Sequence, residues 1–445
     1  MQIEQIKVEG LFGRFNYDIA LRRPEGITII HAPNGFGKTV LLTMVNAFFS
    51  RQFEVFFKYQ FTTFSLQFDD HQSVQITRGG QPQLFAEPQR QKDSSVEVSI
   101  SLTTPGTRFE PFHVKTLSDV LPALNRLLPF LEPAGPFTWF DERSGELVST
   151  TDVIARYGDS LPSDWRKRVE IPDWLKSLVD STECRLIETQ RLLRISRADD
   201  NYRVQRRPTS PTRAVVEMEA RDLAHRISAT LAEYANSSQS LDQSFPRRVI
   251  AALDSDDVPS ADNVTQHLRD VDEKRSSLIQ AGLLDKSGAP EILTQAELRG
   301  KQVRLVIGVY LDDMNHKFAK FDQLFERVSL FKEIISEKFQ FKSVLISREK
   351  GMGVVADDGS IISLTDLSSG EQHELVLLYE LLFGVRDDAL ILIDEPELSL
   401  HVGWQVRFLP DLQRIQKLKP LQIILATHSP QIIGENWDLT VELKS

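Results

Sequence analysis

Two stretches that lie far apart in the 445-residue sequence carry side chains suited to phosphate chemistry. Residues 32–39 read Ala-Pro-Asn-Gly-Phe-Gly-Lys-Thr, and Asp394 and Glu395 follow the apolar run of residues 390–393. A glycine-containing loop that ends in Gly-Lys-Thr can hold a polyphosphate, because its backbone N–H groups converge on one point. A carboxylate near such a loop can bind the accompanying Mg²⁺, and a second one can accept a proton from an attacking water. Together the two stretches predict hydrolysis of ATP.

Individual roles follow from the chemistry of each side chain. Lys38 would reach the β- and γ-phosphates, Thr39 and Asp394 would bind Mg²⁺, and Glu395 would act as the general base. The loop residues predicted to contact ATP are Asn34, Gly35, Phe36, Gly37, Lys38 and Thr39. The alternative is an ordinary strand–turn–helix corner and, much later in the chain, a strand followed by an acidic turn.

Two further polar residues end strands that are predicted from apolar runs. Gln190 ends the strand that begins at residue 184, and His428 directly follows the run at residues 421–427. Open α/β sheets bind ligands at the carboxyl ends of their parallel strands. We therefore predict that His428 contacts the γ-phosphate and that Gln190 orients the attacking water or touches Mg²⁺, which makes both catalytic candidates alongside Glu395.

A fourth stretch, Leu-Ser-Ser-Gly-Glu-Gln at residues 367–372, precedes a predicted helix. Serine hydroxyls and the N–H groups of a helix N-terminus form an anion-binding end. The candidate nucleotide contacts in this stretch are Ser368, Ser369, Gly370 and Glu371. A helix cap of the Ser-x-x-Glu kind would explain Ser368 and Glu371 equally well.

The elements that position these residues are predicted from apolar periodicity. Residues 27–30 and 390–393 are short apolar runs typical of buried strands, and the loop at 32–39 leads into a helix with apolar residues between Val40 and Phe48. Alternating apolar residues in 1–23 and 53–115 indicate antiparallel strands. The fold class is therefore α/β: a mixed, largely parallel sheet with a P-loop core, an antiparallel β layer and an inserted α-helical, coiled-coil-like domain.

Five segments are expected along the chain: an N-terminal lobe at 1–115, an insertion at 116–180 that looks mostly helical, a strand segment at 181–200, a helical insertion at 201–340 and a C-terminal lobe at 341–445. The longest helix is expected to have about 25 residues, or about 37 Å, which is too short for a long coiled-coil arm. A hairpin turn is expected near Gly351 to Gly353 and another at Asp358-Gly359.

Composition indicates a cytoplasmic protein. The net charge is −11, the apolar fraction is 41%, and no run approaches the roughly 20 apolar residues of a membrane span. The N-terminus lacks the basic-then-apolar pattern of a secretory signal. Cys184 is the only cysteine, which excludes an intrachain disulfide and a cysteine-built zinc site. No contact with a membrane is expected.

The motifs jointly resemble those of ABC-type ATPases. Residues 32–39 resemble the Walker A loop, although Ala32 stands where that pattern has glycine, and residues 390–395 resemble Walker B. Gln190 is similar to the Q-loop, residues 367–372 to the LSGGQ signature, residues 398–401 to the D-loop and His428 to the H-switch. The resemblance implies an ABC-ATPase head with ATP and Mg²⁺ as cofactors. It also implies composite sites in a homodimer or a higher oligomer built from such dimers.

The layout resembles soluble ABC ATPases of the RecF, SMC and OLD kind, since Gly370 lies 332 residues beyond Lys38. In a transporter subunit, little separates these two motifs. The stretch Leu-Phe-Gly-Arg-Phe-Asn-Tyr-Asp-Ile at residues 11–19, the P-loop and Ile-Glu-Thr-Gln-Arg-Leu-Leu at residues 187–193 resemble AAA-type, ABC-like ATPase components of anti-phage systems such as PARIS and Septu. Because the sequence ends 17 residues after His428, no nuclease domain of the OLD type is expected. The resemblance thus implies a sensor that responds to a phage-encoded trigger and regulates a separate effector, of the nuclease kind. The alternative is a DNA-repair or DNA-end-binding ATPase.

One charged segment stands apart from these motifs. Residues 191–213 contain seven arginines and two aspartates, a local charge of +5. Arg191 and Arg213 delimit this arginine-rich segment, which follows Gln190 directly. Two interpretations remain open: a solvated loop, or a contact for nucleic acid or an acidic partner.

Overall fold

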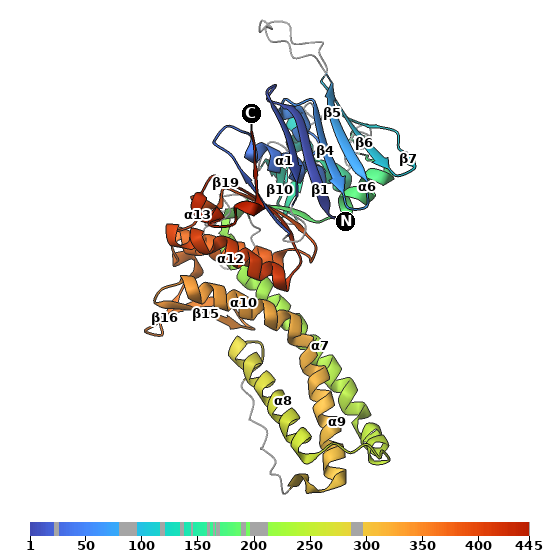
Figure 1. The fold of residues 1–445 in the computed structure, drawn as a ribbon, viewed down its shortest axis with the longest axis vertical. Coiled ribbons are helices and arrows are strands. Elements are labelled where there is room, and N and C mark those ends of the chain that lie inside the picture. The colour runs from blue at the N-terminus through green and yellow to red at the C-terminus, as the bar shows by residue number, and fades with distance from the viewer. Residues whose placement is uncertain are drawn as a thin grey trace, which may run out of the picture. The chain divides into compact units, whose positions relative to one another are not determined.

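The computed structural model describes residues 1–21, 26–79, 96–115, 121–133, 138–143, 146–157, 161–162, 165, 170–187, 193–195, 212–285 and 297–444. These residues form two compact units (Figure 1). Unit 1 contains residues 1–213 and 384–445, and unit 2 contains residues 214–383. Unit 2 therefore holds the segment 341–383, which the sequence had grouped with the C-terminal lobe.

A parallel sheet forms the centre of unit 1. Its strand order is β12 (Cys184–Ile187), β18 (Leu390–Asp394), β19 (Gln422–Thr427), β3 (Ile27–His31) and β20 (Thr440–Glu442), and every neighbouring pair is parallel. All residues of β19 are buried, as are all but the last of β3 and β18. Strands covered on both faces read as continuous apolar runs, which is why the sequence identified them.

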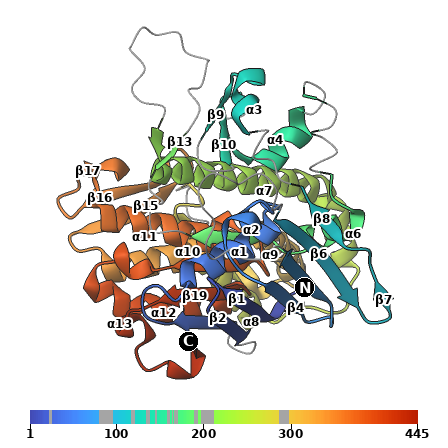
Figure 2. The same ribbon diagram turned by 90° about the horizontal axis from the view of Figure 1, so that it is seen from above.

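An antiparallel sheet forms a second layer of unit 1. Its strands are β1 (Ile3–Leu11), β2 (Phe15–Ala20), β4 (Thr63–Phe68), β5 (Ser73–Gly79), β6 (Glu97–Thr104), β7 (Thr107–Arg108) and β8 (Phe112–Val114). One hydrophobic core joins residues of this sheet, of the helix α1 (Lys38–Phe49) and of the parallel strands. Figure 2 shows β1 of this sheet between β2 and β4. The fold class predicted from the sequence is confirmed: a P-loop α/β core, an antiparallel layer and an inserted helical region.

The segment between residues 121 and 180 differs from its mostly helical prediction. It contains the helices α3 (Leu121–Leu127), α4 (Thr150–Tyr157) and α6 (Asp173–Asp180), and also a three-stranded sheet. The strands are β9 (Leu131–Pro133), β10 (Thr138–Asp141) and β11 (Glu146–Ser149). Trp139 and Val148 face each other in this sheet and are buried in a small separate core. Strands of three or four residues are too short to show a period, which is why the sequence did not reveal them.

Glu54 gives unit 1 a pH-dependent stability. The residue precedes the short helix α2 (Val55–Lys58) and is 6% exposed. Burial raises the pKa of its carboxyl from 4.5 to about 7, although hydrogen bonds to its own backbone and to Thr151 act in the opposite direction. Between these two values the unfolded chain ionises Glu54 and the folded chain does not, so stability falls as the pH rises. The total loss is about 3 kcal/mol.

The variant Glu54→Gln is expected to remove this pH dependence, because the amide stays neutral in both states. Its melting temperature should exceed that of the wild type at pH 8, and the difference should vanish near pH 4.5. Thermal unfolding followed by circular dichroism at both pH values measures this. Glu110→Gln, at an exposed position, is the control. An equal shift in melting temperature at the two pH values would contradict the prediction.

Unit 2 is built around long helices. They are α7 (Val215–Leu253), α8 (Ala261–Ala281), α9 (Lys301–Phe318) and α10 (Asp322–Lys338), and α9 packs against both α7 and α8 (Figure 1). The expected limit of about 25 residues was wrong, since α7 has 39 residues. A helix of that length spans about 58 Å. None of the helices in the described part of the chain is both long and apolar enough to cross a membrane.

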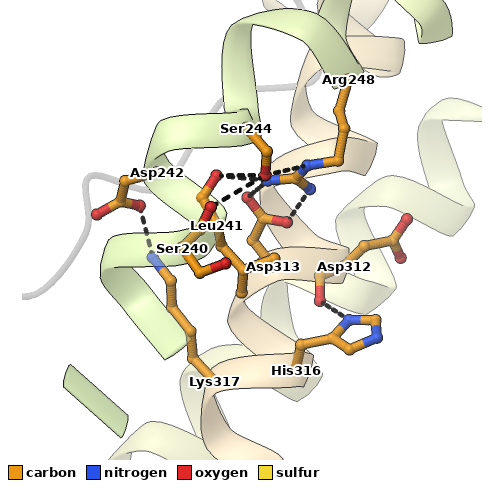
Figure 3. Close-up of polar contacts among 9 residues, drawn as sticks. All are labelled: Ser240, Leu241, Asp242, Ser244, Arg248, Asp312, Asp313, His316 and Lys317. Carbon is orange, nitrogen blue, oxygen red and sulfur yellow. Dashed lines mark hydrogen bonds and ion pairs between the residues drawn. The ribbon is translucent and has the colours of Figure 1, made fainter. Parts of the chain in front are cut away.

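Helix α7 continues through Pro246, a residue that ordinarily breaks a helix, and several side-chain contacts lie close to it. Arg248 forms a bidentate ion pair with Asp313 of α9 and donates a hydrogen bond to the Leu241 carbonyl at 2.8 Å (Figure 3). The Ser244 hydroxyl lies 3.1 Å from the Leu241 carbonyl oxygen as well. Two side-chain donors thus reach the Leu241 carbonyl near the proline, and the ion pair joins α7 to α9 at the same level.

The second half of unit 2 carries a small sheet and the helix that follows residues 367–368. The strands β15 (Lys342–Ser347), β16 (Gly351–Ala356) and β17 (Ile361–Ile362) are antiparallel, and α11 (Ser369–Tyr379) continues into a π-helical turn, η5 (Glu380–Gly384). The turn at Asp358-Gly359 is confirmed, whereas the first turn lies at 348–350, just before the predicted position. Two polar contacts join α11 to the long helices: a buried ion pair, Lys338–Glu374, and a hydrogen bond from Tyr379 to Asp222 of α7.

Candidate nucleotide-binding site

The parallel sheet of unit 1 brings three of the predicted motifs to one edge. The loop 32–37 follows β3, Asp394 is the last residue of β18, and His428 follows β19, which lies between those two strands. The register pairs Asp394 with Ala426 and Thr427 with His31, so all three strands end at the same level. Because parallel strands end on the same side of a sheet, residues more than 350 positions apart meet there.

Gly37 shapes the loop where it enters α1. It is the N-cap of the helix in a left-handed conformation, with φ 82°. A Cβ atom at this position would lie 2.9 Å from Leu11 Cδ2 and 3.1 Å from Phe12 Cε2. Glycine is therefore required at residue 37 both by backbone conformation and by close contact with the β1–β2 turn. Asn34, Gly35 and Thr39 are exposed on this loop and on the first turn of α1.

Lys38 is the buried cation of the loop. Its residue is 4% exposed, and its Nζ atom donates to the carbonyl oxygens of Ala32 at 2.8 Å and Pro33 at 3.4 Å. The substitution of alanine for glycine at position 32 leaves this contact in place, because the contact uses the main chain. The ammonium group is thus held inside a loop whose outer residues are exposed, an arrangement that fits an incoming phosphate chain.

Phe36 has a structural contact that the sequence did not indicate. Its carbonyl oxygen accepts a hydrogen bond of 2.8 Å from the Tyr17 hydroxyl, and its ring lies 5.3 Å from that of Phe15. Burial raises the pKa of Tyr17, which keeps the hydroxyl protonated and able to donate. The loop is therefore fixed to strand β2 through its main chain.

Glu395 lies in a strained backbone conformation. Its φ is 43° and its ψ is 56°, in the left-handed region that side chains other than glycine rarely adopt. The Glu395 N–H donates to the Ala426 carbonyl at 2.9 Å, which holds the residue against the end of β19. Strain of this kind persists only where surrounding contacts impose it, and it gathers at functional sites. The left-handed conformation of Glu395 ends strand β18 directly after Asp394.

His428 lies between two carboxylates. Its Nδ1 atom is 3.8 Å from Glu395 Oε1 and 3.1 Å from Glu397 Oε1. Glu397 belongs to the short helix η6 (Pro396–Leu398), and sequence reasoning gave it no role although it lies in the same Asp-Glu-Pro-Glu stretch as the catalytic candidates. The contact depends on a residue 31 positions away in the sequence, so periodicity could not reveal it. A further acidic residue beside a predicted catalytic pair was the available signal.

The stretch 367–372 lies in unit 2 and forms the predicted helix N-terminus. Ser368 is the N-cap of α11, and Ser368 and Glu371 form a capping box. Lys342 also donates to Glu371 at 2.7 Å. Burial raises the pKa of Glu371, but the hydrogen bonds from Lys342 and Ser368 outweigh burial and lower it overall. Ser368 and Glu371 thus have the capping role that the sequence left open, while Ser369 is exposed in the first turn.

Other predicted residues have no described position. Gln190 lies outside the described residues, as do all but short parts of the arginine-rich segment 191–213. Within the described ranges, no group of three or more histidine, cysteine, aspartate or glutamate side chains is arranged to hold a metal ion. A Mg²⁺ ion at this site would be held by Thr39 and Asp394 together with the phosphates of ATP, as carboxylate and hydroxyl donors of P-loop sites do.

Most of the chain matches one protein-family model, and a short part of it matches a characterised relative. Residues 33–434 match the protein-family model described as "AAA domain, putative AbiEii toxin, Type IV TA system". The "Retron Ec83 probable ATPase" of Escherichia coli is 29% identical over 93 residues, which span 18% of this chain and only 17% of that protein.

Solved structures with a similar fold include two heads of SMC proteins. The SMC head domain of Pyrococcus furiosus, with an extended coiled coil and bound to the C-terminal domain of ScpA, is 14% identical with a TM-score of 0.37. That match covers 97% of this chain and 91% of the other. The SMC head domain of Thermotoga maritima is 11% identical with a TM-score of 0.35, and the match covers 99% and 94% of the two chains. These similarities concern the fold alone.

Proposed function

The chain belongs to the AAA-domain family that its residues 33–434 match and is an ATPase, and on this premise we propose that it hydrolyses ATP at composite sites between two copies and regulates a separate effector. The observation that carries the site assignment is the meeting of Lys38, Glu395 and His428 at one edge of a parallel sheet.

The proposed chemistry follows from the residues at that edge. Lys38 and the N–H groups at the start of α1 bind the phosphates, and Thr39 and Asp394 hold Mg²⁺, which neutralises charge on the β- and γ-phosphates. Glu395 accepts the proton of the attacking water. His428, held beside Glu395, contacts the γ-phosphate or that water. Gln190, three positions after the last residue of β12 in the sequence, is proposed to complete the site.

Two features support a site completed by a second copy. Ser369 is exposed and Gly370 half-buried at the N-terminus of α11, where free N–H groups can receive the γ-phosphate of another subunit. Beside the catalytic turn, Leu398, Val402 and Val406 are 66%, 59% and 60% exposed. Their spacing of four residues places Val402 and Val406 on one face of α12 (Val402–Leu418). An exposed apolar stripe next to a catalytic carboxylate suits burial in a dimer interface.

A mixing experiment tests the composite site. Lys38→Ala removes the phosphate-binding lysine and Ser369→Arg blocks the end of α11, so each variant alone should be inactive. In an equal mixture, half of the dimers combine the two chains, and each of these has one intact site. ATPase activity should therefore recover to about a quarter of the wild-type value. Each variant incubated with itself is the control, and no recovery in the mixture would contradict the arrangement.

The regulatory role is proposed in anti-phage defence, in the cytoplasm. The family description names a toxin and a Type IV TA system, and the matched relative is named a probable ATPase of a retron, which supports this proposal. The effector is proposed to be a separate nuclease, and the trigger a phage-encoded molecule. Since a ligand shifts a conformational equilibrium only through different affinities for the two states, the effector should bind ATP-loaded and nucleotide-free protein with different affinities.

The word "toxin" in the family description favours a second candidate function, in which the chain itself is the toxic agent. Incubation of the purified protein with Mg²⁺, ATP and plasmid DNA or RNA distinguishes the regulatory function from the toxic one by whether the nucleic acid is cleaved. Cleavage that persists through purification would favour this second function. The third candidate, a DNA-repair or DNA-end-binding ATPase, predicts ATP turnover that rises with DNA. Nucleic acid would then contact the arginine-rich segment 191–213, and its binding would weaken steeply with salt.

A further inference from the structure

The carboxylate of Glu397 contacts three groups at the carboxyl end of strand β19. Its Oε1 atom accepts hydrogen bonds from the Thr427 hydroxyl at 2.8 Å and from the backbone N–H of His428 at 3.0 Å, and lies 3.1 Å from His428 Nδ1. The Glu397 side chain is 6% exposed, whereas that of His428 is 42% exposed. One nearly buried oxygen therefore fixes both the main chain and the ring of a histidine whose other side is open.

The contact also decides which ring nitrogen carries a proton. A carboxylate oxygen 3.1 Å from Nδ1 favours a proton on that nitrogen, because a carboxylate accepts hydrogen bonds and an imidazole N–H donates them. The second nitrogen, Nε2, is then left for the nucleotide or the attacking water, since the partner of one ring nitrogen sets the role of the other. Without Glu397, both nitrogens and the rotation of the ring would be free to change.

The turn after β19 and the turn after β18 are also joined by a second link, which does not use the Glu397 carboxylate. The Ser429 hydroxyl donates to Gln405 Oε1 at 3.0 Å, and Gln405 Nε2 lies 3.3 Å from the Glu397 carbonyl oxygen. Gln405 thus ties the turn after β19 to the turn after β18 through atoms that do not touch the imidazole. The Glu397 carboxylate is the contact that reaches the ring.

We propose that Glu397 is a positioning residue of the ATPase site, which acts through His428 by holding Nδ1 protonated and Nε2 available. The inference rests on the ATPase activity of this site but not on the composite arrangement or on any effector. It assigns a function to the second glutamate of the Asp-Glu-Pro-Glu stretch, separate from that of Glu395.

A double-mutant cycle in the full chain tests the proposal. Glu397→Ala and the milder Glu397→Gln should lower kcat by about 10- to 100-fold, the range for losing a hydrogen bond to a charged group that orients a catalytic side chain. KM for ATP should change by less than about threefold, because the phosphate loop is untouched. In a His428→Ala background, the same substitutions should lower kcat by less than about twofold. Glu435→Gln, at an exposed position, is the control.

Equal losses of kcat in the two backgrounds would overturn the proposal, since Glu397 would then act without His428. A second measurement does not require turnover. In protein labelled with ¹⁵N-histidine at alkaline pH, where a free imidazole is neutral, the His428 signals are those absent from His428→Gln. They should show a proton on Nδ1 in the wild type and a mixture of tautomers in Glu397→Ala. Identical spectra would overturn the positioning role, even if the site hydrolysed no ATP.

Discussion

Glu395→Gln is expected to slow ATP hydrolysis by about 10²- to 10⁴-fold, the loss typical of a removed general base. Glutamine has nearly the same shape but cannot accept the proton of the attacking water. Nucleotide binding should persist, because the residue is held by main-chain contacts at the end of β18 and takes no part in the loop 32–39. Single-turnover hydrolysis and equilibrium ATP binding, measured on the same preparation, separate the two effects.

The control for this substitution is Glu442→Gln, in the solvent-exposed end of β20. It should hydrolyse ATP at the wild-type rate. Under the composite-site proposal, Glu395→Gln protein with ATP should also accumulate as a dimer in sedimentation experiments. Hydrolysis within a few-fold of the wild type would show that Glu395 is not the base, whatever the oligomeric state.

Lys38→Ala is expected to abolish ATP binding at concentrations that saturate the wild type. The substitution removes a cation that lies within the phosphate loop, and hydrogen bonds between charged groups contribute about 1.5–3 kcal/mol each. A weakening of at least about 10- to 100-fold follows, which isothermal titration with ATP would measure. Lys38→Met retains most of the buried aliphatic chain and should lose binding equally.

The comparison of alanine with methionine separates binding from packing. Lys38 is buried and its ammonium group contacts the Ala32 and Pro33 carbonyls, so alanine removes packing as well as charge. If only Lys38→Ala lost binding while Lys38→Met retained it, the lysine would be a structural residue of the loop. Lys444→Ala, at the exposed C-terminal end, should bind ATP normally.

The sequence was informative where burial imposes a simple pattern. Strands β3, β18 and β19 are buried on both faces, so their apolar runs predicted that the loop 32–39, Asp394 and His428 lie at strand ends. The same logic failed for β9 to β11, whose short strands pack in a small separate core. Periodicity reports burial over several repeats, and it gives no signal where an element contains only one or two of them.

Contacts between distant residues set the other limit. The proposed role of Glu397 involves Thr427 and His428, and Arg248, two residues after Pro246 of α7, pairs with Asp313 of another helix. The local preference of proline favours a break of α7 at Pro246. In the folded chain α7 continues there, and Arg248 forms an ion pair with another helix nearby. Such contacts are properties of the folded chain, and a single sequence contains no pattern that identifies them.

The contacts of α11 have a mechanical consequence within unit 2. Because Lys338 and Asp222 bind α11 to α10 and α7, the helix that begins at Ser369 and the long helices should turn together as a lever. The buried ion pair resists separation, since removing one partner of such a pair typically costs about 3–5 kcal/mol. With α7 about 58 Å long, a rotation of only about 5° at the α11 end displaces the far end of the lever by about 5 Å. A small rotation of the helix that begins at Ser369 would thus become a much larger displacement at the far end of α7.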